Sequence, residues 1–287
     1  MVISEEYADF ICGCGAGCLE TILLYPQSKL IFRQQLHGVF AREAIRQLRN
    51  EGFARLYRGL LPPLIMRATS RSLMFGIFGN LEGYFECKKY SSRATFTACY
   101  SSAAILAGSA EAILCPLERV QVLLQSAHYH ERFYNTGHAL KEVSKLGLRE
   151  LYRGLSVVLI RNGFGNALFF NLREPIRNAV LSLDEKFVCK HERIPMSFIR
   201  FFADFVSGAV LGSSISTLLF PLNVVKQRMQ STLNTPLLSA RTIFKIVWRE
   251  RNGSIRGLFR GVHLNYTRSL ITWGIANSVY EFLRRWF

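Results

Sequence analysis

The sequence has no long apolar run, and its mean hydropathy is low. The mean hydropathy index is +0.15, and hydrophobic residues make up 49% of the 287 residues, which is ordinary for a soluble protein. A bilayer-spanning helix normally needs about 20 consecutive apolar residues, and no segment meets that rule cleanly. Composition alone therefore describes a basic, helical, soluble protein.

Acidic residues are also scarce. Asp and Glu together number 20 against 36 Lys and Arg, so the formal net charge is +16. An excess of this size favours contact with phosphates, whether these belong to a nucleic acid, an anionic lipid or a phosphorylated solute.

The patterns that mark most enzymes and metalloproteins are missing. The sequence has no nucleophile paired with a base, no metal-ligand spacing and no glycine-rich phosphate loop. We therefore expect neither catalysis, nor a bound metal, nor a cofactor. Among the seven cysteines, Cys12, Cys14 and Cys18 lie between Gly and Ala, where small side chains suit helix packing better than zinc binding. A disulfide framework is not expected in so long a chain, and no signal-peptide or Arg-rich presequence pattern is present.

What the sequence does contain is one unit that occurs three times. An aromatic residue followed by Arg and Gly recurs at intervals of about a hundred residues. Upstream of each copy, a Pro interrupts an apolar stretch, and a Gln follows nine residues after that Pro. The three Pro residues are Pro26, Pro116 and Pro221. The spacing predicts three repeats within one integrated domain, over residues 1–92, 93–194 and 195–287.

Each repeat is predicted to hold two long helices with a short amphipathic helix between them. The long helices are expected over 7–36, 62–87, 94–126, 156–181, 197–231 and 262–286, and the short ones over 41–50, 136–145 and 239–251. Small residues four positions apart recur before each Pro, at Gly13 and Gly17 in the first repeat, and this spacing lets helix backbones approach closely in lipid. Six such helices with polar faces favour an all-α membrane bundle around a water-filled cavity, which replaces the soluble interpretation. The Pro in each odd-numbered helix should kink it.

The repeated motifs resemble those of the mitochondrial carrier family. Its signature is Pro-x-acid-x-x-base-x-base, followed later by Gly, four residues, aromatic, base and Gly. The resemblance implies six transmembrane helices in three pseudo-threefold repeats, a multi-pass position in the mitochondrial inner membrane, alternating access and a monomeric carrier. It also implies cardiolipin binding where helix N-termini attract anions. The lipid-binding residues carried over in this way are Arg58, Gly59, Arg153, Gly154, Arg260 and Gly261.

The sequence departs from the family at the matrix gate. The family places an acid two residues after each Pro and a base three residues further on. The corresponding residues here are Ser28 and Ile31, Glu118 and Gln121, and Asn223 and Lys226. The expected partners across repeats are Ser28 with Lys226, Glu118 with Ile31, and Asn223 with Gln121. None of these is an ion pair, so the gate is predicted to be weak or held by hydrogen bonds.

The cytoplasmic gate is thinned as well. The family's aromatic-acid-x-x-base pattern survives at Glu281 with Arg284 and in part at Glu174 with Arg177. The family pairing leaves one complete ion pair, Glu174 with Arg284.

Helix geometry predicts a solute-binding layer. Seven residues past a motif Gly rise about 10 Å into the even-numbered helix, and seven residues back from an odd-helix gate position reach the same depth. The even helices place Met66, Arg67, Arg161, Asn162 and Arg268 there, and the odd helices place Glu111, which we expect to be the only acid of the layer.

The residue types of this layer indicate an anionic solute. Arginine forks bind phosphate oxygens, and an amide such as Asn162 can contact a base or carboxamide. Glu111 could face a cationic ring, bond ribose hydroxyls or neutralise an arginine. Arg67 could instead extend to the matrix interface, and Met66 is expected to be a wall contact. The residues alone reach only a phosphate-bearing, nucleotide-like anion.

Within the family, residues 32–36, 116–121, 220–226 and 263–274 resemble the members that import NAD. NAD or a related dinucleotide is therefore the expected substrate, with cardiolipin as the expected lipid. Alternatives are a carrier of another phosphorylated anion, such as a nucleoside phosphate or coenzyme A, and a carrier-fold scaffold without transport. A soluble protein that binds nucleic acid is disfavoured, because it leaves Arg161 and Arg268 in apolar helices unexplained.

Overall fold

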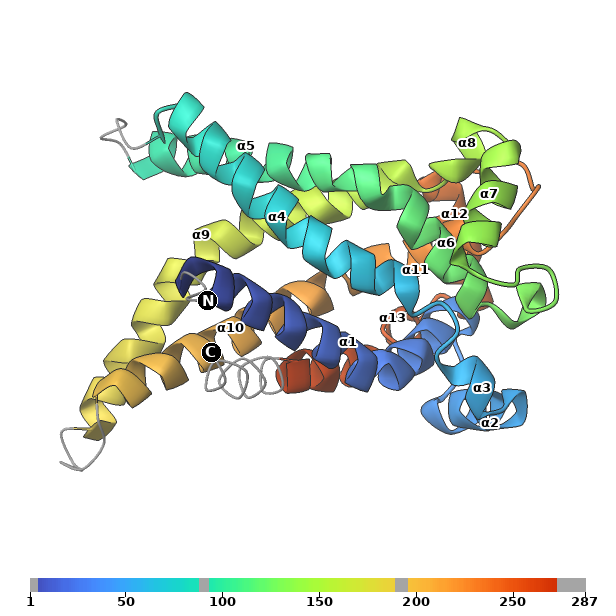
Figure 1. The fold of residues 1–287 in the computed structure, drawn as a ribbon, viewed down its shortest axis with the longest axis horizontal. Coiled ribbons are helices and arrows are strands. Elements are labelled where there is room, and N and C mark those ends of the chain that lie inside the picture. The colour runs from blue at the N-terminus through green and yellow to red at the C-terminus, as the bar shows by residue number, and fades with distance from the viewer. Residues whose placement is uncertain (1–4, 88–92, 189–195, 273–287) are drawn as a thin grey trace.

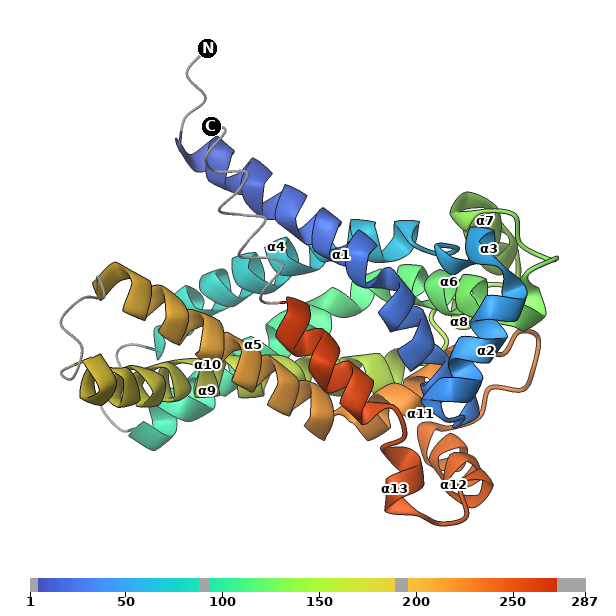
Figure 2. The same ribbon diagram turned by 90° about the horizontal axis from the view of Figure 1, so that it is seen from below.

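The computed structural model describes residues 5–87, 93–188 and 196–272. Its long helices are α1 (Glu5–His37), α4 (Leu61–Tyr84), α5 (Arg93–Ala110), α9 (Leu155–Val188) and α10 (Met196–Leu218). The sixth predicted helix begins at residue 262 and is described as far as residue 272. Helix α9 packs against both α5 and α10 (Figures 1 and 2).

Three short helices lie at one end of the bundle, on the right in Figure 1. They are α2 (Ala41–Glu51), α7 (Thr136–Lys145) and α12 (Ala240–Glu250), and they match the predicted amphipathic segments within two residues. Each buries two apolar residues four positions apart, such as Ile243 and Val247 in α12. Residues at this spacing share one helix face, so each short helix lies flat against the bundle.

Glycine fixes the turn that follows each short helix. One helical turn, α3 (Phe53–Leu56), α8 (Leu148–Leu151) or α13 (Ile255–Leu258), stands between two glycines of positive φ in each repeat. In the first repeat these are Gly52 at φ 86° and Gly59 at φ 84°. Residues with a Cβ rarely adopt this backbone region, which explains why Gly recurs at both positions. The sequence indicated these glycines but not the helical turn between them.

The three prolines affect their helices differently. Helix α1 runs without a break through Pro26. In the second repeat a 3₁₀ turn, η2 (Glu111–Leu114), precedes α6 (Cys115–Gln125), which has Pro116 in its first turn. In the third, α10 and α11 (Phe220–Gln230) bend by 58° ahead of Pro221. The helix is therefore interrupted near Pro in two repeats. There the proline lies in the first turn of the new helix, where a backbone N–H has no carbonyl partner within the helix and its absence costs no hydrogen bond.

More helices of the bundle are apolar enough to span a membrane than we predicted from the sequence. In the described part of the chain, segments Thr97–Gln125 and Leu155–Val180 are long and apolar enough to cross a membrane. The bent pair Val206–Leu218 and Phe220–Gln230 qualifies as a third span if it is counted as one. The expectation that no segment meets the hydropathy rule was thus wrong, because a helix around a polar cavity tolerates a few charges.

Small residues pack helices closely in the second repeat. Ala103 and Ala107 are fully buried in a cluster with Phe78 and Phe170, whose rings stack 3.8 Å apart. Gly108 lies so near α9 that an added Cβ would be 2.6 Å from the Asn162 carbonyl oxygen. By contrast, an added Cβ at Gly17 would meet nothing within 4 Å. The predicted close approach is therefore confirmed in repeat 2 and is absent at Gly17.

A disulfide joins Cys87, just beyond α4, to Cys99 in α5. It ties repeat 1 to repeat 2 at the end of the bundle opposite the short helices (Figure 1). This bond was not predicted, since no local spacing in the sequence distinguishes these two thiols from the other cysteines.

Candidate substrate-binding site

A cavity of about 320 Å³ lies between α9, α10, α11 and η2. Its polar lining comes from repeats 2 and 3 and consists of one carboxylate, one guanidinium, a hydroxyl and three amides. These residues are Glu111, Arg161, Ser216, Asn162, Asn166 and Asn223. A concave site with a few convergent polar groups is the usual form of a small-molecule site. The cavity brings together Glu111, Arg161 and Asn162, as the sequence predicted.

Glu111 opens the 3₁₀ turn η2, where the second odd helix changes pitch. Its carboxylate interacts with the side chains of Ser70 on α4 and Asn166 on α9, and it lies in the electrostatic field of Arg161. Neither Ser70 nor Asn166 was singled out in the sequence. Asn166 follows Asn162 by four residues, a spacing that places both amides on one helix face and could have revealed it.

Arg161 is held by two neighbours in this cavity. Its Nε lies 3.0 Å and its Nη2 2.5 Å from Oδ1 of Asn162, to which both donate. Nη2 also lies 3.3 Å from Oε1 of Glu118 on α6. The guanidinium therefore connects the cavity to the gate position below it, and an incoming phosphate would compete with the Glu118 carboxylate for it.

Glu118 also pairs with Lys226 of α11, whose Nζ lies 3.2 Å from Oε2. The expected matrix-gate pairing was therefore wrong: Lys226 faces Glu118 and not Ser28, whose hydroxyl donates to the Leu24 carbonyl within its own helix. The prediction that the gate holds no complete ion pair fails with it. The acid position of repeat 2 pairs with the base position of repeat 3 and not with that of repeat 1. The sequence of a single repeat does not specify which neighbouring repeat supplies the partner.

Ile31 stands at the gate's base position in repeat 1, and it is packed among apolar residues. It is buried in a cluster with Phe220, Val224 and Val225 of α11. Gln121 is partly exposed, and its backbone carbonyl faces the motif residue Gly59. The matrix gate thus combines one ion pair with apolar packing.

Arg67 on α4 binds a carboxylate that the sequence analysis missed. Its Nη2 lies 2.7 Å from Oε1 of Glu20 on α1, and its Nη1 lies 3.2 Å from Oε2. The Glu20 side chain is completely buried, whereas that of Arg67 is 27% exposed. The expectation that Glu111 is the only acid of the layer was therefore wrong. The position of Glu20, one residue before the predicted layer residue Thr21, was the available signal.

Arg268 is partly exposed on the sixth helix and lies in the electrostatic field of both Arg67 and Glu20. Its Nε is buried without a hydrogen-bond partner among the described residues. Met66 is also partly exposed. Arg71, one helical turn beyond Arg67 and a further candidate for the cavity lining, has a side chain outside those that the structure describes.

Comparison with known proteins agrees with this architecture. Three stretches, residues 4–89, 92–182 and 198–287, match the family described as mitochondrial carrier protein. The chain belongs to the mitochondrial carrier family. It therefore has the six-span carrier fold and is a multi-pass protein of the mitochondrial inner membrane.

Several relatives of this carrier have names that state a substrate. The mouse mitochondrial nicotinamide adenine dinucleotide transporter SLC25A51 is 45% identical over 277 residues, which cover 96% of this chain and 88% of the mouse protein. The human transporter SLC25A52, named for the same dinucleotide, is 43% identical over 97% of this chain and 89% of its own length. Human solute carrier family 25 member 53 is 33% identical over 98% of this chain and 88% of its own length.

The carrier's cytoplasmic gate is described only in part. Glu174 lies 4.0 Å from Arg177, one turn later in α9, and both side chains are at least 36% exposed. Glu281 and Arg284 lie outside the described residues, so the predicted pair between Glu174 and Arg284 stays a prediction.

The motif arginines of the carrier bind protein carbonyl groups of the following repeat. Arg58 donates to the carbonyl oxygens of Tyr129 and Phe133. Arg260 donates to the Gly38 carbonyl, and its guanidinium lies 4.3 Å from the Phe40 ring centroid. The motif glycines allow the neighbouring repeats to pack closely at these contacts. A Cβ at Gly261 would lie 2.9 Å from the Gln34 side-chain oxygen.

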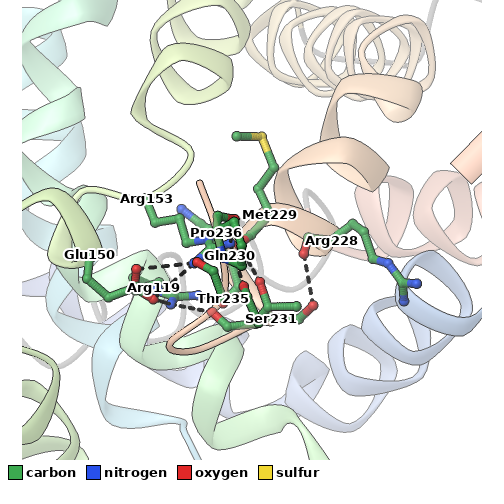
Figure 3. Close-up of polar contacts among 10 residues, drawn as sticks. Arg119, Glu150, Arg153, Arg228, Met229, Gln230, Ser231, Thr235 and Pro236 are labelled. Atoms are coloured by element: carbon green, nitrogen blue, oxygen red, sulfur yellow. Dashed lines mark hydrogen bonds and ion pairs between the residues drawn. The ribbon is translucent and has the colours of Figure 1, made fainter. Parts of the chain in front are cut away.

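Arg153 shows this role most completely (Figure 3). Its guanidinium donates to Glu150 at 3.1 Å, to the carbonyls of Thr235 and Pro236 at 2.9 Å each, and to the Thr235 hydroxyl at 2.7 Å. Arg119 shares the same carboxylate, 2.6 Å from Glu150 Oε1. Arg153 is only 5% exposed, because these protein groups surround its side chain. That Arg153 binds lipid stays a prediction.

A second cavity of about 650 Å³ lies between repeats 3 and 1 at the same end of the bundle. Its cationic and imidazole side chains are Arg251, Arg256, Arg260, His37 and His263. Gly38 and Ala41, beside the start of α2, complete it together with Gly261. This set of groups suits an anionic headgroup.

Proposed function

We propose that this carrier imports NAD into the mitochondrial matrix by alternating access. The observation that carries the proposal is the cavity that unites the Glu111 carboxylate with the Arg161 guanidinium and the amides of Asn162, Asn166 and Asn223. Oxidised NAD bears a cationic nicotinamide ring and an anionic pyrophosphate, so it needs both charges from its site. The relatives named as NAD transporters, at 43 to 45% identity, support the same substrate.

In this proposal Glu111 faces the nicotinamide ring and the arginines hold the pyrophosphate. A cavity of about 320 Å³ holds one half of a dinucleotide, and the other half would extend towards Arg67 and Arg268. Arg161 begins bound to Glu118, and the pyrophosphate takes the place of that carboxylate. The competition would loosen the Glu118–Lys226 pair and so couple binding to gate opening.

We further propose that the carrier acts without chemical change of its solute, as a monomer, and that cardiolipin occupies the cavity between repeats 3 and 1. The cluster of arginines and histidines around Gly38 and Gly261 supports the lipid assignment. The clamp contacts of Arg153 argue that the corresponding lipid contacts come from backbone N–H groups and neighbouring residues.

The test is uptake of labelled NAD into cardiolipin-containing liposomes that hold the purified protein. Unlabelled NADH, NMN, ATP and coenzyme A compete in parallel. Saturable NAD uptake that resists ATP and coenzyme A would establish the function. Uptake of ATP or coenzyme A in preference to NAD would identify a carrier of another nucleotide, and no uptake by folded protein would favour a scaffold.

A further inference from the structure

We infer that Glu20 is a specificity-determining residue, which limits the positive charge of the solute layer and so favours a dinucleotide of low net charge over polyanionic nucleotides. The inference rests on the proposed function. Its basis is the ion pair between the fully buried Glu20 carboxylate and Arg67, at 2.7 and 3.2 Å.

A buried carboxylate at mid-membrane depth is costly and needs a reason. Glu20 has both oxygens directed at one guanidinium, and the described structure offers Oε1 no hydrogen-bond partner beyond that ion pair. Arg67 itself is 27% exposed, so its guanidinium keeps accessible surface for a solute phosphate while it stays bound to Glu20. The Glu20 carboxylate therefore neutralises the charge of Arg67 without fully burying its guanidinium.

The repeats differ in how their arginines are neutralised. Arg67 pairs with Glu20 of the same repeat, and Arg161 pairs with Glu118 of the same repeat. Repeat 3 has Ile215 at the position of Glu20 and Asn223 at the position of Glu118, and no acid occurs between residues 205 and 249. Arg268 thus has no carboxylate at either of these two positions of its own odd helix, although it lies in the fields of Glu20 and Arg67.

This asymmetry leaves Arg268 as the anchor for an entering phosphate, because Glu20 balances Arg67, and Glu111 and Glu118 together balance Arg161 and Lys226. Oxidised NAD has two pyrophosphate charges and one compensating nicotinamide charge, so it needs little excess positive charge. NADH and ADP-ribose carry one more net negative charge, and ATP carries more again. Each added negative charge on the solute gains less binding free energy from a layer whose arginines are paired with carboxylates than from one whose arginines are unpaired.

The test compares Glu20→Gln with wild type, measuring inhibition of labelled NAD uptake by ADP-ribose, NADH and ATP. Removing one carboxylate about 10 Å from the solute should raise the affinity for ADP-ribose relative to NAD roughly tenfold, and that for ATP by more. Arg67→Gln should shift the ratio in the opposite direction. The double variant should return towards the wild-type ratio even if its absolute uptake is lower.

The readout separates charge selection from a structural role. If Glu20 only positions Arg67, Glu20→Gln lowers uptake of every solute alike and leaves the inhibition ratios unchanged, which would overturn the inference. Glu20→Asp keeps the charge and should keep the ratios, and it serves if Glu20→Gln does not fold. Glu43→Gln on the exposed face of α2 is the matched control. Wild type that takes up no NAD would reject the proposed function itself.

Discussion

Glu118 and Lys226 form an ion pair 3.2 Å long that joins α6 of repeat 2 to α11 of repeat 3. Both side chains are about nine-tenths buried, and Glu118 also binds Arg161 at 3.3 Å. One carboxylate therefore links the wall of the cavity to the matrix gate.

Breaking this pair should destabilise the closed carrier. We expect Lys226→Met to lower the free energy of unfolding by about 2 to 3 kcal/mol, because the buried Glu118 carboxylate would keep only the partly exposed Arg161 as a cationic partner among the described residues. Thermal unfolding in detergent measures the loss, and adding Glu118→Gln should recover part of it. Arg228→Met is the control: its pair with Glu250 is partly exposed, so less than about 1 kcal/mol should be lost. Simple additivity of the two gate substitutions would contradict the coupling.

Two cavity residues should be needed for transport but not for folding. We expect Glu111→Ala and Arg161→Ala each to abolish NAD uptake, since they remove the one carboxylate and the one guanidinium that the described residues contribute to the cavity lining. Uptake into liposomes, beside an unfolding curve for each variant, makes the distinction. Transport at the wild-type rate by both variants would refute the site.

The Arg153 clamp should contribute stability independently of lipid. We expect Arg153→Lys to cost about 2 to 3 kcal/mol, because a single ammonium nitrogen cannot span the acceptors that Nη1 and Nη2 reach separately in Glu150, Thr235 and Pro236. Arg149→Lys, on the exposed face of the same turn, should be nearly neutral. The loss should be equal with and without cardiolipin, as followed by thermal unfolding. A loss of stability seen only with cardiolipin would indicate that the Arg153 side chain contributes to lipid binding.

Gly108 should tolerate no side chain. A Cβ there would lie 2.6 Å from the Asn162 carbonyl oxygen and 3.0 Å from Asn166 Nδ2, so Gly108→Ala must push α5 from α9 and displace both cavity amides. We expect a loss of about 1 to 3 kcal/mol and weaker NAD uptake. Gly17→Ala meets nothing within 4 Å and should be neutral or slightly stabilising. Equal unfolding temperatures for the two variants would argue against the close contact.

His130 should make stability depend on pH. Burial, followed by the charges of Arg58, Lys29, Arg33 and Arg55, lowers the pKa of His130 from 6.5 to about 4. Between these values the unfolded chain binds a proton that the folded chain does not, so stability falls as pH drops from about 6.5 towards 4. His130→Gln should flatten this part of the profile, measured as unfolding temperature from pH 7.5 to 5. The exposed neighbour His128→Gln should not, and identical slopes for all three proteins would reject the assignment.

The local features of the fold could be predicted because each depends on residues that are close together in the sequence. Helix lengths, the three amphipathic helices and the turns at the motif glycines follow from periodicity and backbone preference. The depth of the solute layer followed from helix rise alone, and it placed Glu111, Arg161 and Asn162 on one cavity. Asn166 was within reach of the same argument.

The partners of the charged residues could not be predicted in this way. Placing Glu20 beside Arg67, Glu118 beside Lys226 and Arg161, and Arg153 beside the Thr235 and Pro236 carbonyls depends on how the helices rotate and slide against one another. A shift of one residue turns a side chain by about 100° around its helix axis, and the periodic pattern tolerates such a shift. Periodicity and spacing therefore specify the three repeats, their helices and the types of charge at mid-membrane. Which charges neutralise one another follows from helix packing, because ion pairing depends on interatomic distances of a few ångströms between helices that are far apart in the chain.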